Sequence, residues 1–175
     1  MTTTDRVVDA LDFVAVHQAD PLAAALLEGL ASEYSARYGG DAEHKHSELL
    51  AYPAEEFEPH AGALIVGVSR GVPVAGGAFR RYDSMTAELK RIWTATAYRQ
   101  RGYGKLVVAE LERIALLRGY TRVYLTTGWR QPEAVALYLA MGYTPLYDQS
   151  LDSDEIGRHP FEKLLAGGGF QEDTA

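Results

Sequence analysis

Large apolar side chains recur at four-residue spacing between positions 21 and 38 of the chain. The residues that share this spacing are Leu22, Leu26, Leu30 and Tyr34. Such a repeat is typical of a helix with one buried face. Pro21 favours a helix start and Gly39-Gly40 a helix end, so the pattern predicts a helix over residues 21–38.

Shorter apolar runs, each bounded by turn signals, predict strands. Residues 63–68 and 72–80 form two such runs, and Ser69-Arg70-Gly71 between them is a hairpin signal. Tyr82-Asp83-Ser84 turns the chain into a further strand over residues 86–94. Four more strands are predicted at 12–16, 122–127, 144–147 and 159–164.

Helical periodicity returns in the second half of the chain. One helix is predicted over residues 104–118, before Gly119, and another between Pro132 and Gly142. A short helix near residues 47–51 fits the polar segment 41–60. Hairpins followed by a strand–helix–strand–helix–strand order predict an α/β fold with a central sheet of mixed direction.

The length of 175 residues suits one domain that spans residues 1–175. We expect the ordered core to cover about residues 6–165. Both termini are expected to be flexible, because the first residues are polar and the last segment carries Gly167-Gly168-Gly169.

The formal net charge of −7 argues against nucleic acid as a partner, because binding a phosphate backbone needs a basic surface. An acidic surface could attract a cationic amine, although solubility alone also explains this charge. No apolar run approaches the ~20 residues that span a bilayer. The first residues also lack a basic start followed by an apolar stretch. These features predict a cytoplasmic protein with no membrane partner.

The chain contains no cysteine, which excludes disulfides, thiolate catalysis and cysteine-bound zinc. His44 and His46 are two positions apart, but no third ligand is evident beside them. A solvated loop therefore explains the two histidines, and no metal site is predicted.

One short segment carries the features of an anion site: Arg99-Gln100-Arg101-Gly102-Tyr103-Gly104-Lys105. It follows an extended run and opens a helix, whose first N–H groups have no intrahelical partner. Glycines allow close approach of the backbone, and the helix dipole favours negative charge. The segment predicts a phosphorylated ligand, and a basic turn on a solvated surface is the alternative.

Two other phosphate-binding motifs do not fit this segment. A P-loop needs four residues between its glycines and a hydroxyl after its lysine, whereas one residue separates these glycines and Leu106 follows Lys105. A dinucleotide fingerprint needs a third glycine where Val107 stands. Residues 99–104 instead match the pattern Arg/Gln-x-x-Gly-x-Gly/Ala without a gap.

That pattern resembles the coenzyme A pyrophosphate loop of the GNAT superfamily of N-acetyltransferases. Residues 87–94 resemble the family strand before the loop, and residues 134–143 resemble its Ala-x-x-Leu-Tyr-x-x-x-Gly-Phe/Tyr helix. The resemblance covers roughly residues 60–165 and, more loosely, the whole chain. Residues 34–39 and 53–57 resemble a bacterial subgroup of the superfamily without an assigned substrate. It implies a GNAT fold in which two parallel strands, here 86–94 and 122–127, splay apart to admit acetyl-CoA.

The resemblance also implies a set of cofactor contacts. The pyrophosphate would bind at residues 99–105, and the end of the preceding strand would pair with the pantetheine amides and supply an oxyanion-binding N–H. Gln131 stands where many relatives carry an asparagine that contacts the cofactor. The implied cofactor residues are Ile92, Trp93, Thr94, Arg99, Gln100, Arg101, Gly102, Tyr103, Gly104, Lys105 and Gln131.

Two residues are candidates for proton transfer. Glu88 falls where histone-modifying members place their catalytic glutamate, and it would act on the amine directly or through a water. A positioning or structural carboxylate is the alternative. Tyr138 occupies the tyrosine position of the family helix and would protonate the leaving thiolate, whereas core packing is its alternative role. On a regular strand Lys90 would share the face of Glu88, and Arg91 would take the other face.

The acceptor site is the least defined part of the prediction. The resemblance implies that the first helix and the strands before Glu88 line it, with these candidates: Glu33, Tyr34, Arg37, Arg80 and Tyr147. The predicted activity is direct transfer of an acetyl group from acetyl-CoA to the primary amine of a small molecule in a ternary complex. Transfer to proteins or peptides and a non-catalytic acyl-CoA sensor are the alternatives, and a homodimer is a family-level expectation.

Overall fold

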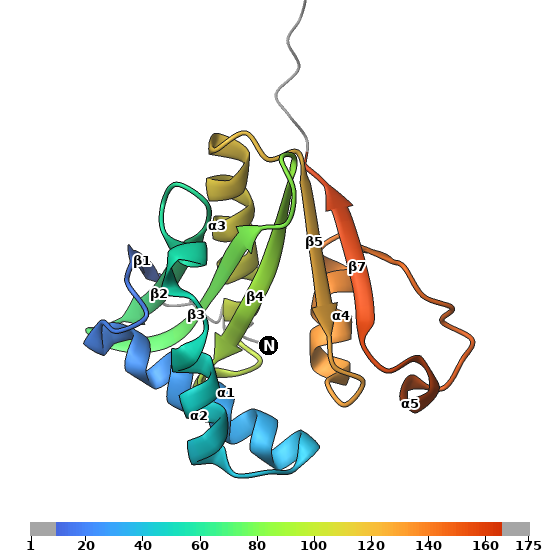
Figure 1. The fold of residues 1–175 in the computed structure, drawn as a ribbon, viewed down its shortest axis with the longest axis horizontal. Helices are drawn as coiled ribbons and strands as arrows, with labels where there is room; N and C mark the ends of the chain where they lie inside the picture. Colours follow the sequence, from blue (N-terminus) through green and yellow to red (C-terminus); the bar gives the residue numbers. More distant parts are fainter. Residues whose placement is uncertain (1–9, 166–175) are drawn as a thin grey trace, which may run out of the picture.

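The computed structural model describes residues 10–165, which form one seven-stranded sheet with helices on both faces (Figure 1). The sheet has the strand order β1-β2-β3-β4-β5-β7-β6. The strands are β1 (Asp12–Ala15), β2 (Ala63–Ser69), β3 (Val72–Arg81), β4 (Thr86–Thr94), β5 (Arg122–Thr127), β6 (Thr144–Pro145) and β7 (His159–Leu164). The termini that were expected to be flexible fall largely outside the described residues.

Only β4 and β5 pair in parallel, whereas the other neighbouring strands pair antiparallel. The predicted α/β class with a mixed sheet is therefore confirmed. The parallel pairing begins at Thr86 with Arg122 and ends at Glu88 with Tyr124, although β4 continues to Thr94 and β5 to Thr127. The two strands thus diverge toward their C-terminal ends, as predicted, and Figure 1 shows the resulting V.

The helices form two layers. The first layer holds α1 (Pro21–Tyr38), α2 (Ala42–Ala51) and the 3₁₀ helix η1 (Ala54–Phe57), and the second holds α3 (Tyr103–Leu117) and α4 (Pro132–Ala140). Two clusters of buried apolar side chains fill the spaces between the sheet and these layers. Leu26 and Leu30 of α1 pack with Trp93 in one, and Val107 and Leu111 of α3 pack with sheet residues in the other.

Helix α1 has the predicted bounds, and the Asp20 side chain caps it by accepting a 2.8 Å hydrogen bond from the Leu22 N–H. Its buried face is broader than the four-residue pattern indicated. Leu22 and Tyr34 are only partly buried, whereas the fully buried residues of this helix are Ala23, Leu26, Leu27, Leu30 and Ala31.

Three predictions of elements need correction. Helix α2 begins at Ala42, earlier than expected, because the Asp41 carboxylate caps it through the His44 N–H at 2.9 Å. The strand predicted at 144–147 is shortened to the two residues of β6. The short helices η1, η2 (Thr96–Tyr98) and α5 (Ser153–Ile156) were not predicted.

A β-bulge interrupts β4 beside the point where it leaves β5. Gly76 pairs with Trp93 and Ala78 with Lys90, so two residues of β4 stand opposite one residue of β3. Arg91 adopts a left-handed backbone with φ of 60°. Lys90 and Arg91 therefore lie on one face, both over the Tyr52 ring at 5.6 and 5.5 Å, and the expected alternation of the two side chains was wrong.

Helix α1 approaches the end of β4 closely at Gly29. A Cβ atom at this position would lie 2.2 Å from Trp93 Nε1, and the indole is only 6% exposed. We predict that Gly29→Ala lowers the free energy of unfolding by about 1–3 kcal/mol, because the buried ring must move. Chemical denaturation measures this change, and Ser32→Ala on the exposed side of α1 is the control. Equal stability of the two variants would contradict the close packing of α1 on β4.

Candidate active site

A cleft of about 790 Å³ lies where β4 and β5 diverge. Helix α1 borders it on one side, and the start of α3 and the length of α4 border it on the other. Most of the residues predicted for a site line this cleft: Glu33, Tyr34, Arg37, Ile92, Trp93, Thr94, Arg99, Gln100, Gly102, Tyr103, Gly104, Lys105, Gln131 and Tyr138. Glu88, Arg80, Arg101 and Tyr147 are not among its lining residues.

The segment before α3 has the geometry of an anion cradle. Gln100 and Gly102 both adopt left-handed backbone, with φ of 61° and 82°, and these turns lead directly into the helix. Gly102 is the N-cap and provides no side-chain cap, so the N–H groups of the first turn face a ligand unblocked. A Cβ atom on Gly104 would lie 3.3 Å from Leu137 of α4, so glycine allows the start of α3 to approach α4 closely.

The cations of this segment point in different directions. The Arg99 guanidinium donates to the Thr94 carbonyl at 3.3 Å and pairs with the Glu33 carboxylate at 3.2 Å. The Arg101 guanidinium lies over the Tyr98 ring at 5.1 Å, and Arg101 is not among the residues that line the cleft. Lys105 lines the cleft beside the first turn of α3. Arg99 and Lys105 are thus the two cations of the loop that a bound phosphate would meet.

The end of β4 offers backbone groups to the cleft. Beyond Glu88 no strand of residues 10–165 pairs with β4 on the side of β5, so within this part of the chain the edge from Leu89 to Thr94 is open there. An extended ligand with amide groups can pair with such an edge as a strand would. Gln131, at the other wall, accepts a 2.8 Å hydrogen bond at Oε1 from the Thr127 hydroxyl, which leaves its amide NH₂ group to donate.

Tyr138 lines the cleft from α4 and is only 5% exposed. The ring packs against Tyr143 and Phe161 at centroid distances of 5.5 and 5.8 Å. Within residues 10–165 the hydroxyl makes no hydrogen bond, in contrast to that of Tyr143, which donates to Glu112 at 2.8 Å. Burial raises the pKa of Tyr138 above its ordinary value, so the phenol keeps its proton at neutral pH.

Tyr34 is the second phenol in the cleft, and it reaches it from α1. Burial raises the pKa of Tyr34 to about 12, and the neighbouring Glu33 adds to this effect. Tyr34 and Glu33, which were both predicted to contact the acceptor, both line the cleft, and their contact with an acceptor stays a prediction.

Glu88 belongs to a cluster of charged side chains from β3, β4 and η1. It is 7% exposed, and its carboxylate pairs with Arg80 at 3.0 Å and with Lys90 at 3.2 Å. Arg80 also approaches Glu56 at 3.6 Å, so its contacts are with carboxylates of the protein. Of this cluster only Lys90 lines the cleft, which means that Glu88 can reach an acceptor only through an intervening group.

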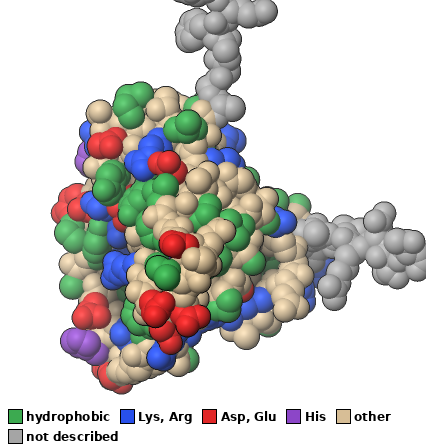
Figure 2. Space-filling view, turned by 90° about the vertical axis from the view of Figure 1, so that its right-hand side faces the viewer, with side chains coloured by type: hydrophobic (Ala, Val, Ile, Leu, Met, Phe, Trp, Pro, Cys, Tyr) green, Lys and Arg blue, Asp and Glu red, His purple; other side chains and the backbone are tan. Residues whose placement is uncertain are grey.

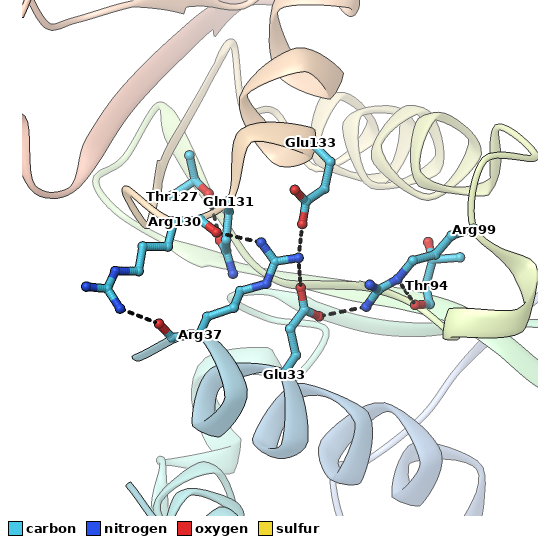
Figure 3. A network of polar contacts seen from close by, with 8 residues as sticks. All are labelled: Glu33, Arg37, Thr94, Arg99, Thr127, Arg130, Gln131 and Glu133. Carbon is cyan, nitrogen blue, oxygen red and sulfur yellow. Dashed lines mark hydrogen bonds and ion pairs between the residues drawn. The ribbon is translucent and has the colours of Figure 1, made fainter. Parts of the chain in front are cut away.

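A polar network crosses the cleft from α1 to α4, and sequence reasoning did not find it (Figure 3). Arg37 donates to the Arg130 carbonyl at 2.6 Å and pairs with Glu133 and, at 3.1 Å, with Glu33. Arg130 donates in return to the Arg37 carbonyl at 3.0 Å. Arg37 and Arg130 lie 93 positions apart in the sequence, so no local spacing could have revealed the contact between them.

The space-filling view in Figure 2 shows the face that carries β7 and the loop before it. Acidic and basic side chains intermix there with scattered apolar ones, a pattern typical of a solvated surface. No helix among residues 10–165 is long and apolar enough to cross a membrane. In the same part of the chain no group of three or more metal-ligating side chains was found.

Comparison with known proteins relates this fold and cleft to one family. Residues 25–143 match the model of the acetyltransferase (GNAT) family. N-acetyltransferase 8 from Rattus norvegicus is 32% identical over 92 residues, which cover 53% of this chain and 40% of the relative. The match to a second rat protein, N-acetyltransferase family 8 member 3, covers 45% of that relative, so the chain spans less than half the length of these curated relatives.

Two solved structures share the fold at low sequence identity. An acetyltransferase of the GNAT family from Staphylococcus aureus has a TM-score of 0.70 at 14% identity, over 90% of this chain and 100% of that chain. The PaiA N-acetyltransferase from Thermoplasma acidophilum, solved in complex with coenzyme A, has a TM-score of 0.68 at 15% identity, over 89% and 99%. Because the family match spans well over half of its residues, the chain belongs to the acetyltransferase (GNAT) family.

Proposed function

We propose that the protein transfers the acetyl group of acetyl-CoA to the primary amine of a small molecule. One observation carries the proposal. The cleft between β4 and β5 joins an uncapped helix start, suited to a pyrophosphate, to the free hydroxyl of Tyr138. Family membership and the coenzyme A complex of the Thermoplasma relative support the choice of cofactor. The cytoplasm, where acetyl-CoA is found, remains the predicted location, and a homodimer remains a prediction.

In this proposal the pyrophosphate binds at residues 99–105, against the N–H groups of the first turn of α3. The pantetheine arm follows the unpaired edge of β4 from Thr94 toward Leu89, and Gln131 faces it from the opposite wall. The other predicted contacts, Ile92, Trp93 and Tyr103, line the same passage. Arg101 is the exception, because it is not among the residues that line the cleft.

The reaction forms a C–N bond between the amine and the acetyl carbon and breaks the C–S bond of the thioester. The amine must first lose a proton, since at ~pH 7 only about one in a thousand amines with an ordinary pKa is neutral. The departing sulfur must gain one. Tyr138 supplies this second proton, because its phenol is protonated, unpartnered and inside the cleft.

Glu88 assists removal of the first proton through a relayed water. The relay is required because Glu88 does not line the cleft and both of its oxygens already pair with cations. Lys90 pairs with one of these oxygens and lines the cleft, so the relayed water would lie between Glu88 and the cleft on the side of Lys90.

We predict that Glu88→Gln lowers kcat by about 100-fold at neutral pH. The loss should shrink as pH rises toward the amine pKa of ~10.4, because neutral amine then needs less assistance. A pH–rate profile from pH 6 to 10 measures this. Glu56→Gln is the matched control, since Glu56 also pairs with Arg80 but is not on β4. A loss that is the same at every pH, or equal in both variants, would assign Glu88 a structural role.

The network from α1 to α4 favours a small acceptor over a peptide. Arg37, Arg130 and Glu133 close the cleft where a groove for an extended chain would have to continue. Transfer to protein lysines or N-termini is the second candidate, and a sensor that binds acetyl-CoA without turnover is the third.

Release of free thiol from acetyl-CoA tests the proposal. Polyamines, amino acids, aminoglycosides and peptides are supplied as separate pools, and the protein adds no thiol because it has no cysteine. Release with one small-molecule pool is the expected result and identifies the acceptor class. Release with peptides alone would favour the second candidate, and silence in all pools despite tight acetyl-CoA binding would favour the sensor.

A further inference from the structure

The carboxylate of Glu33 forms ion pairs with two arginines that lie in different parts of the cleft (Figure 3). One oxygen pairs with Arg37 of the same helix at 3.1 Å, and the other pairs with Arg99 at 3.2 Å. The Glu33 side chain is 17% exposed and lines the cleft, as both arginines do. Glu33 therefore connects the segment that would bind pyrophosphate to the network that reaches α4.

Arg99 is occupied by oxygen atoms of the protein. Its Nε donates to the Thr94 carbonyl, and its terminal nitrogen donates to Glu33. A pyrophosphate at residues 99–105 would bring a second anion to the same guanidinium. Two anions on one cation repel each other, so the carboxylate and the pyrophosphate cannot both gain the full attraction of Arg99.

We propose that Glu33 competes with the cofactor pyrophosphate for Arg99 and thereby sets the affinity for coenzyme A. The inference rests on the proposed function, because it assumes that the pyrophosphate binds at residues 99–105. The bound pyrophosphate takes Arg99, and Glu33 keeps its contact with Arg37. The α1 to α4 network stays closed during this exchange, because Arg37 is also held by Glu133 and the Arg130 carbonyl.

Glu133 provides a matched comparison for Glu33. Both carboxylates line the cleft and pair with Arg37, but only Glu33 contacts Arg99. Neutralising either residue removes one negative charge near the bound phosphates. A general electrostatic effect would therefore change coenzyme A affinity similarly in the two variants, whereas direct competition would single out Glu33.

The test is calorimetric titration of coenzyme A into the wild-type protein, Glu33→Gln and Glu133→Gln, with the three proteins compared at a low and at a high ionic strength. We expect Glu33→Gln to bind coenzyme A about three- to fivefold more tightly, in line with the strength of a partly exposed ion pair. Glu133→Gln should stay close to the wild type. The gain should decrease as salt screens the charges. Inorganic pyrophosphate, titrated as a competitor of coenzyme A, should show the same gain.

Three outcomes would overturn the inference: unchanged or weaker binding by Glu33→Gln, an equal gain in both variants, or a gain for coenzyme A that inorganic pyrophosphate does not reproduce. Failure of the wild-type protein to bind coenzyme A is a different result. It would refute the proposed function itself, so the two failures can be told apart.

Discussion

Replacing Gly102 with glutamate should abolish binding of acetyl-CoA. Gly102 has a φ of 82°, and a residue with a side chain pays about 1–2 kcal/mol to adopt this left-handed backbone. The new carboxylate would also stand at the N-cap of α3, where the pyrophosphate is proposed to bind. Calorimetric titration should show a loss of affinity of at least about 100-fold, because repulsion between anions adds to the backbone strain.

Gly102→Ala separates the two contributions. Open space surrounds the position of a Cβ atom there, so alanine introduces backbone strain without a clash or a charge. We expect a small loss of stability and a much smaller loss of affinity than with glutamate. The glutamate variant should still fold, because a negative charge at a helix N-terminus is favourable. If Gly102→Glu bound acetyl-CoA with wild-type affinity, the pyrophosphate could not bind at this segment.

Replacing Tyr138 with phenylalanine should slow turnover by about 100-fold and leave the affinity for acetyl-CoA nearly unchanged. The substitution removes only a hydroxyl that makes no hydrogen bond within the described part of the chain, so stability should also be preserved. Single-turnover kinetics and a binding titration on the same preparation measure the two quantities. A loss of affinity with an unchanged rate would show that Tyr138 binds the cofactor and is not the acid.

Tyr143→Phe is the matched control for this experiment. Its hydroxyl donates to Glu112 at 2.8 Å, so its removal should cost about 1 kcal/mol of stability with little effect on rate. The pH dependence gives a second check. Because burial raises the pKa of Tyr138 above its ordinary value of ~10, the acid stays protonated and the rate should not fall with rising pH below about pH 9. If the rate of the wild-type protein fell with rising pH below about pH 9 and that fall were absent in Tyr138→Phe, the raised pKa of Tyr138 would be contradicted.

The sequence was most informative where the signal is local. The repeat from Leu22 to Tyr34, with Pro21 before it and glycines after it, predicted both ends of α1. The glycines of residues 99–105 predicted a helix start suited to an anion, because glycine favours left-handed turns and permits close approach of the backbone. The divergence of β4 and β5 came from the resemblance to a family, since no periodicity reports where two strands separate.

The parts that were missed depend on contacts between distant segments or on unusual backbone. Arg91 is not a residue type that predicts a φ of 60°, so the bulge and the shared face of Lys90 and Arg91 could not be foreseen. The pairing of Glu88 with Arg80 and Lys90 depends on the register of β3 and β4. The network between Arg37 and Glu133 depends on the packing of α1 against α4.

The residues predicted to contact the acceptor divide into two groups. Glu33 and Tyr34 line the cleft, but Arg80 and Tyr147 do not, because each has partners elsewhere. The remaining candidates all come from α1. Variants of this helix should therefore change amine specificity before they change the chemistry of transfer.

A crystal structure of the protein with bound acetyl-CoA tests the central claim most directly. We predict that the pyrophosphate lies against the backbone N–H groups of residues 100–105. Arg99 should then pair with the pyrophosphate and no longer with Glu33. The thioester sulfur should lie within hydrogen-bond distance of the Tyr138 hydroxyl. A cofactor whose pyrophosphate lies away from this segment, or whose thioester lies far from Tyr138, would contradict the proposed site and mechanism.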